Sequence, residues 1–177
     1  MRSFSGVREN LVRLEAAGSI VGVVRALSGG DEADRRVFNL LYHALDALEG
    51  REEDVKSVEA AFGLKLSILA GYTPRLDTCV SCGRDLGEAA DEDSPGFAPS
   101  LGSALCANCC SASDSFPLPP GTLAALQSLV VCPIKEAAVE ERLEENVCRV
   151  VFAHVLAHAP GNTVLAVPGQ RRTLHLT

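Results

Sequence analysis

The sequence predicts an all-α protein, a helical bundle with an inserted hairpin held by four cysteines. Apolar residues recur at three- and four-residue steps on both sides of residues 75–116, and this is the period of amphipathic helices. Between the two helical regions, Gly, Ser, Asp and Cys dominate, which is typical of a loop stabilised by something other than apolar burial. Hydrophobic residues make up 47% of the 177 residues and charged residues 22%, so the chain can bury a core.

Three helices are expected before the hairpin. The first spans residues 4–27 and presents one apolar line, Phe4, Val7, Leu11, Leu14, Gly18 and Val21. Glycines end it, and Asp31 or Asp34 can cap a second helix over about residues 34–49. The third helix follows the acidic residues 52–54 and ends at Gly71, and its apolar line is Val55, Val58, Phe62, Leu66 and Leu69.

Two helices are expected after the hairpin. A short one spans residues 122–131, and a longer one begins at Pro133 and ends at Ala159. The apolar line of the longer helix is Val139, Leu143, Val147, Val150 or Val151, and Val155. The predicted organisation is therefore a first part of the bundle over 1–75, a zinc-binding hairpin over 76–116, a second part over 117–159 and an irregular tail over 160–177.

Charge and hydropathy narrow the function classes. No apolar run approaches the roughly 20 residues that a membrane-spanning helix needs, and the first ten residues lack a signal-peptide pattern, so we expect a cytoplasmic protein without membrane contact. The net charge is −7, and residues 79–116 hold one basic and six acidic side chains. Since tracking phosphates requires a basic excess, this chain alone is expected to bind DNA weakly or not at all.

The cysteines predict a metal site. Cys79 and Cys82 form one C-x2-C pair, and Cys106 and Cys109 form a second. Two such pairs facing each other give the tetrahedral four-sulfur shell that zinc prefers, and a closed shell of this kind makes the single zinc ion structural. Cys110 competes with Cys109 as the fourth ligand, although only Cys109 keeps two residues between the sulfurs on both sides. Four reduced cysteines in a loop are the alternative, and they explain the paired spacing poorly.

The remaining candidates are weaker. Cys132 and Cys148 are interpreted as packing residues. His154 and His158 stand one helical turn apart and could bind a metal, but no third ligand is evident nearby in the sequence. No phosphate-binding loop or catalytic set of side chains is recognisable, so we do not expect an enzyme.

Four segments carry a resemblance to a known family. They are "SFSGVRENLVRLEAAGSIVGVVRAL", "FNLLYHALDALEG", "LKLSILAGYTPRLDTCVSCGR" and "GFAPSLGSALCANCC". With these segments the chain resembles the C-terminal part of RecO, the bacterial recombination mediators. The match covers roughly residues 3–130, and it places Cys79, Cys82, Cys106 and Cys109 on the family's four zinc ligands.

The resemblance implies a role in DNA repair and homologous recombination without enzymatic turnover. It implies two partners: RecR, and the acidic C-terminal tail of the single-stranded DNA-binding protein. Arg8, Arg13, Lys65 and Arg75 are candidates for contacting that tail, by their location alone. The family's N-terminal OB-fold, its expected DNA-binding module, does not precede the first helix here. The alternative is a freestanding zinc-hairpin scaffold or interaction protein with no DNA role.

Overall fold

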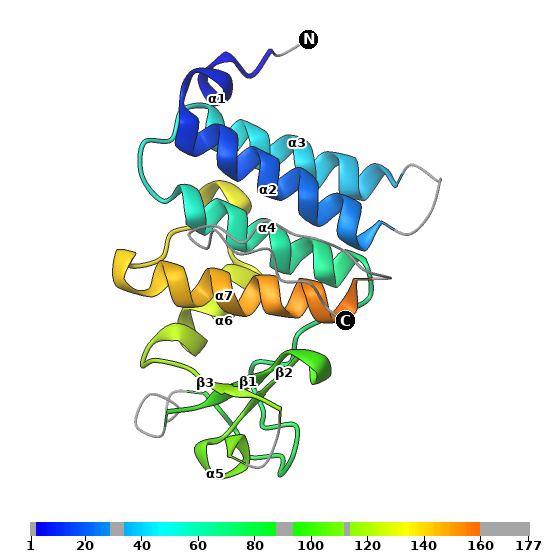
Figure 1. Ribbon diagram of the computed structural model, residues 1–177, viewed down its shortest axis with the longest axis vertical. Helices are drawn as coiled ribbons and strands as arrows, with labels where there is room; N and C mark the ends of the chain where they lie inside the picture. The colour runs from blue at the N-terminus through cyan, green and yellow to red at the C-terminus, as the bar shows by residue number, and fades with distance from the viewer. Residues whose placement is uncertain (1–2, 29–33, 88–93, 112–113, 160–177) are drawn as a thin grey trace.

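The computed structural model describes residues 3–28, 34–87, 94–111 and 114–159, and it confirms the predicted fold class (Figure 1). Helices stack through most of the molecule, and a small three-stranded sheet lies at one end. In chain order the elements are α1 (Ser5–Glu9), α2 (Leu11–Leu27), α3 (Arg35–Glu49), α4 (Val55–Leu69), β1 (Gly96–Ala98), η2 (Pro99–Leu101), β2 (Ser103–Leu105), α5 (Ala107–Cys110), β3 (Phe116–Pro117), α6 (Thr122–Val131), η3 (Ile134–Glu136) and α7 (Glu141–His158). No helix within the described ranges is long and apolar enough to cross a membrane.

Helix α4 is the centre of the bundle. It lies between the α2–α3 pair and α7 (Figure 1), and it also contacts α6. Val58, Phe62 and Leu66 are buried as the sequence predicts, but so are residues on the opposite side of the helix, such as Ala60 and Leu64. Because α4 is buried nearly all round, it positions α2, α3, α6 and α7.

Gly63 sets how closely α7 approaches α4. A Cβ atom at this position would lie 2.5 Å from Cγ1 of Val151 on α7. We expect Gly63→Ala to lower the free energy of unfolding by about 1–2 kcal/mol, because overpacking outweighs the gain in helix propensity. Urea denaturation followed by circular dichroism measures the effect.

Gly18 on α2 provides the matched control, since a Cβ there would meet nothing within 4 Å. Gly18→Ala should raise the free energy of unfolding by about 0.5–1 kcal/mol through helix propensity. In a Val151→Ala background, the cost of Gly63→Ala should shrink. Equal effects at the two glycines would contradict this account of the α4–α7 contact.

The predicted first helix is wrong in two respects. It is broken at Asn10, which is extended and caps α2 by accepting a hydrogen bond from the Arg13 amide at 3.1 Å. The α2 part of the expected apolar line also faces outward, with Leu11 at 69%, Leu14 at 46% and Val21 at 45% exposure, whereas Val7 on α1 is buried as predicted. The core side of α2 consists instead of Ala16, Ala17, Ile20, Val23, Ala26 and Leu27.

Both sides of α2 are apolar, so periodicity alone could not decide which side packs on α4. We call Leu11, Leu14, Gly18 and Val21 the outer stripe of α2.

The predicted second helix is confirmed, with Asp34 as its cap: its side chain accepts a hydrogen bond from the Arg36 amide. The expected start of the last helix at Pro133 is wrong. A short 3-10 turn is followed by extended backbone, and α7 begins at Glu141. Arg51 explains the difference, since its guanidinium donates to the carbonyls of Lys135 and Ala137 at 2.6 Å each. These carbonyls therefore accept hydrogen bonds from a residue far away in the sequence and not from the amides of a continuous helix.

The hairpin packs on the bundle through its sheet. β1 pairs antiparallel with β2, and β3 pairs with the other edge of β1. The two-residue strand β3 was not predicted, because it is short and half of it is proline. Gln127 on α6 donates to the Leu76 carbonyl at 2.9 Å, and the Arg149 guanidinium on α7 lies 4.6 Å from the ring centre of Phe116. The cysteines are thus carried by a hairpin region that contacts α6 through Leu76 and α7 through Phe116.

Candidate metal centre

The first cysteine pair lies in a tight turn. The Gly83 amide donates to the Cys79 carbonyl at 2.8 Å, and the Cys79 amide donates to the Arg84 carbonyl at 2.8 Å. Gly83 has a φ of +74°, which glycine adopts without the steric cost of a side chain. This turn holds the Cys79 and Cys82 side chains on the same side of the loop.

The second pair lies at the start of a single helical turn. Cys106 is the N-cap of α5, and its carbonyl accepts the amides of Cys109 and Cys110 at 3.0 Å each. Residues three apart on one helical turn lie on the same face, so Cys106 and Cys109 point in the same direction.

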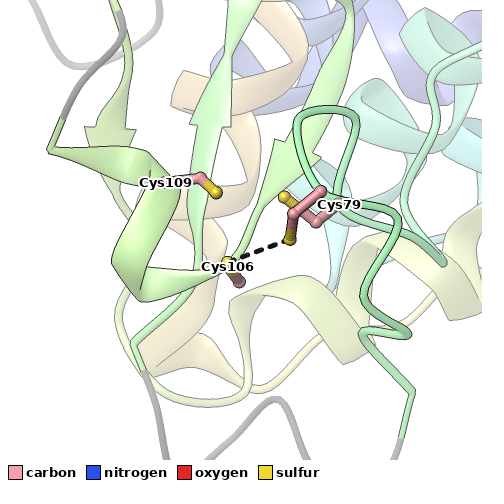
Figure 2. A group of neighbouring side chains, drawn as sticks. Cys79, Cys106 and Cys109 are labelled. Carbon is pink, nitrogen blue, oxygen red and sulfur yellow. Dashed lines mark hydrogen bonds between the residues drawn. The ribbon is translucent and has the colours of Figure 1, made fainter.

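Pairing between the two segments brings the turns together. The Ala104 amide donates to the Arg75 carbonyl at 2.8 Å, and the Val80 amide donates to the Ala104 carbonyl at 3.3 Å. The segment that precedes the first pair therefore runs beside β2, which precedes the second. Figure 2 shows the sulfur atoms of Cys79, Cys106 and Cys109 converging on one point from these elements.

The four sulfurs fit one metal ion. Ligand atoms of Cys79, Cys82, Cys106 and Cys109 all lie within 4.8 Å of one another. The sulfurs of Cys82 and Cys106 are 3.7 Å apart. Four sulfurs at about 2.3 Å from a tetrahedral zinc would be about 3.8 Å from each other. None of the seven cysteines, all within the described part of the chain, forms a disulfide.

The electrostatics of the cluster also fit a cation. Burial acts to raise the pKa of the Cys79 thiol, but amides of Cys106, Cys82 and Ser81 outweigh it and lower this pKa to about 6. For Cys109, the hydrogen bond with the Cys106 side chain, together with burial, raises the pKa of the thiol to about 12. One thiolate forms readily while a second is disfavoured beside it, and a divalent cation removes that conflict.

Cys110 lies outside the four-sulfur cluster. Its sulfur is 3.2 Å from the Ser115 hydroxyl, and it fills the space against Gly96, where a Cβ would be 2.1 Å from it. This contact with β1 directs Cys110 away from Cys79 and Cys82. The geometry therefore favours Cys109 over Cys110, the choice that residue spacing also favoured.

Several other residues singled out in the sequence make contacts that stabilise the fold. Cys148 is buried and its thiol donates to the Lys56 carbonyl at 3.7 Å, while the half-buried Cys132 contacts the Leu129 carbonyl. Arg13 donates to the carbonyls of Arg51 and Glu49, and Lys65 donates to the Val130 carbonyl at 3.0 Å. Arg13 and Lys65 thus join helix ends within the bundle, which leaves Arg8 and Arg75 as exposed candidates for partner contacts.

His154 and His158 are close, with ring centres 4.5 Å apart, but they do not form a metal site with a third ligand among the described residues. His154 is instead buried, with 1% of its surface exposed, on the side of α7 that faces the hairpin. Its place there was not predictable from the sequence, because the only local signal was its spacing from His158.

The fold and the cysteine cluster define a class of protein: a helical bundle that carries a four-cysteine hairpin suited to a metal ion. The family model described as "Recombination protein O C terminal" matches residues 8–163. The chain belongs to the RecO family of DNA repair proteins.

Individual relatives support this assignment. The chain is 57% identical over 171 residues to "DNA repair protein RecO" of Rubrobacter xylanophilus, an alignment that covers 95% of this chain and 66% of the relative. The protein of the same name from Anaeromyxobacter sp. (strain K) is 35% identical over 141 residues, covering 79% of this chain and 54% of the relative. That from Alkaliphilus metalliredigens is 27% identical over 160 residues, covering 88% and 63%. The chain thus spans between about half and two thirds of these relatives' length.

Proposed function

We propose that this chain is a recombination mediator module that works by binding partner proteins, with one structural zinc ion in its hairpin. The match of a RecO family model to residues 8–163 carries this proposal. In it, residues 1–75 and 117–159 form the bundle and residues 76–116 the zinc hairpin, while the predicted tail over 160–177 lies outside the described residues. DNA repair places such a module in the cytoplasm with the chromosome.

Cys79, Cys82, Cys106 and Cys109 are the proposed zinc ligands. Zinc would supply the binding energy that holds the two cysteine-bearing turns of the hairpin together. A shell of four thiolates leaves no coordination position for substrate, so the proposal does not include catalysis.

The outer stripe of α2 is the surface that best suits a partner segment. Leu11, Leu14 and Val21 are exposed on one side of α2, and Arg25 is exposed on the same helix. Arg8 is exposed on α1, the short helix that precedes it. An apolar stripe with basic residues fits a peptide that combines apolar and acidic side chains. The acidic tail of the single-stranded DNA-binding protein is the partner proposed here, and RecR is the second partner that the family suggests. DNA binding by this chain alone is proposed to be weak or absent.

Fluorescence anisotropy with a labelled copy of that acidic tail tests the proposal. We expect micromolar binding to the zinc-loaded chain, and no binding of a peptide with the same residues in scrambled order. Leu14→Glu should weaken binding at least tenfold, because it places a negative charge in the apolar stripe that repels the acidic residues of the peptide.

Val131→Glu is the matched control, since Val131 is 80% exposed on α6 and its replacement should leave the affinity unchanged. Equal binding of the tail and the scrambled peptide would remove the tail as a partner. The alternative of a zinc-hairpin scaffold with no DNA role would then be preferred, although family membership disfavours it.

A further inference from the structure

His154 has a defined proton arrangement. Its Nε2 atom lies 2.9 Å from the carbonyl oxygen of Tyr72, and a carbonyl can only accept a hydrogen bond. Nε2 therefore carries the proton, and Nδ1 is the acceptor of a neutral ring. Nδ1 is buried and has no hydrogen-bond partner among the described residues. A second proton on this ring would be a buried charge without a counterion.

The hairpin closes over the ring of His154. The edge of the ring meets Phe97 on β1, with the ring centres 6.0 Å apart. At Gly102, just after η2, a Cβ atom would lie 2.9 Å from Cε1 and 3.3 Å from Nδ1 of His154. Glycine at this position lets the hairpin backbone approach Nδ1, and the approach leaves no space for a side chain between them.

The charged and titratable groups around His154 are few. On α7 it faces His158, which itself contacts the ring of Tyr72 at 4.9 Å. The hairpin residues against it, Phe97 and Gly102, carry no charge, and the segment after α4 contributes the Tyr72 carbonyl. No carboxylate within the described residues is positioned to stabilise an imidazolium at this place.

The same backbone that closes over His154 also carries the metal ligands. His154 contacts the carbonyl of Tyr72, and Arg75 follows Tyr72 by three residues. The amide of Arg75 donates to the Gly102 carbonyl at 2.9 Å. Beyond Gly102, β2 leads directly to Cys106, and beyond Arg75 the chain leads to Cys79. Both ligand pairs are thus attached to the two segments that meet at His154.

We propose that His154 is a positioning residue for the metal hairpin, so that metal binding and the neutral, docked form of His154 stabilise each other. Loss of the metal loosens the hairpin and gives Nδ1 access to water. In the reverse direction, protonation of Nδ1 forces the hairpin away from α7 and weakens metal binding. Thermodynamic linkage requires that the proton weakens metal affinity by the same factor by which the metal weakens proton affinity at Nδ1. The inference rests on the proposed metal site.

The acid–base behaviour of His154 agrees with this geometry. Burial lowers the pKa of His154 from 6.5 to about 4, the hydrogen bond to Tyr72 opposes this shift and His158 adds to it. Between pH 4 and pH 6.5, the unfolded or undocked chain therefore binds more protons than the docked chain does. The stability of the docked hairpin is complete above pH 6.5 and is lost as the pH falls toward 4.

Nuclear magnetic resonance of the histidine rings tests the inference on the unaltered chain. In the zinc-loaded protein, long-range proton–nitrogen spectra should show His154 as the Nε2–H tautomer and neutral down to about pH 5. After zinc is removed by a chelator, the pKa of His154 should rise by at least about one unit, which corresponds to a tenfold linkage. An identical His154 titration with and without zinc would overturn the proposal.

Zinc release gives an independent readout. Transfer of zinc to a chromogenic chelator at pH 7.5 should be about tenfold faster from His154→Ala than from the wild type. His154→Gln can donate to the Tyr72 carbonyl and should restore part of the difference. His43→Gln, an exposed change on α3, is the control and should release zinc at the wild-type rate.

Equal release rates from His154→Ala and the wild type would also overturn the proposal. A chain that holds no zinc at all would instead contradict the metal site itself, so the two failures are distinguishable.

Discussion

Cys82→Ser is expected to abolish zinc binding and to unfold the hairpin while the helices remain. Cys82 is the exposed member of the cluster, so its replacement removes one ligand and disturbs little packing. Structural zinc in small domains contributes on the order of 10 kcal/mol to folding, which exceeds what the short sheet could supply without it. The helices pack on α4, away from the cysteines, and are expected to remain folded without the metal.

Two measurements check this result together. Elemental analysis should find one zinc per wild-type chain and none in Cys82→Ser, and amide hydrogen exchange should show loss of protection in β1 and β2 but not in α4. Cys132→Ser is the control, because Cys132 lies outside the cluster and is half-buried on the bundle. If Cys82→Ser kept its zinc, or if Cys132→Ser lost it, the assignment of the ligands would be wrong.

Glu59→Gln is expected to stabilise the protein above neutral pH. Glu59 lies on α4, is 3% exposed, and its Oε1 atom lacks a hydrogen-bond partner within the described residues. Burial raises the pKa of Glu59 from 4.5 to about 7, while the Ser19 hydroxyl and Lys56 oppose this shift. The folded protein therefore binds more protons than the unfolded chain between these values, and Glu59 makes the protein less stable as the pH rises through 7.

Chemical denaturation of wild type and variant at several pH values measures the effect. The advantage of Glu59→Gln over wild type in the free energy of unfolding should grow by about 2 kcal/mol between pH 5 and pH 8. Glu15→Gln, an exposed change on α2, should show no such growth. A constant difference between Glu59→Gln and wild type across this range would show that the carboxyl group is not protonated in the core.

Local patterns were sufficient for part of the fold. Gly71, with a φ of +90°, ends the third predicted helix at the expected place, and the helix Thr122–Val131 has the predicted bounds. In these places the signal is a single residue type acting on its own neighbours, such as a helix-ending glycine.

The errors occur where distant residues decide the structure. The carbonyls of Lys135 and Ala137 leave the helical pattern because they accept hydrogen bonds from Arg51, 84 and 86 residues away. Likewise, which apolar side of α2 is buried depends on α4 and not on α2 itself. A period identifies a helix, but it cannot identify the surface against which the helix packs.

The clustering of the four cysteines could be largely predicted because the geometry of each pair is local. Two residues between cysteines allow one tight turn to present two sulfurs, whatever the rest of the fold does. The exclusion of Cys110 needed the structure, since it depends on the contact of its sulfur with Gly96 and Ser115. His154 needed the structure for the same reason, because its partners lie on the hairpin and after α4.

X-ray absorption at the zinc edge, on protein purified without added metal, tests the central claim most directly. We expect one zinc per chain with four sulfur ligands at about 2.3 Å and no nitrogen ligand, because the clustered Cys79, Cys82, Cys106 and Cys109 would form a closed shell. A chain without zinc, or a shell that includes a histidine nitrogen, would contradict the four-cysteine centre.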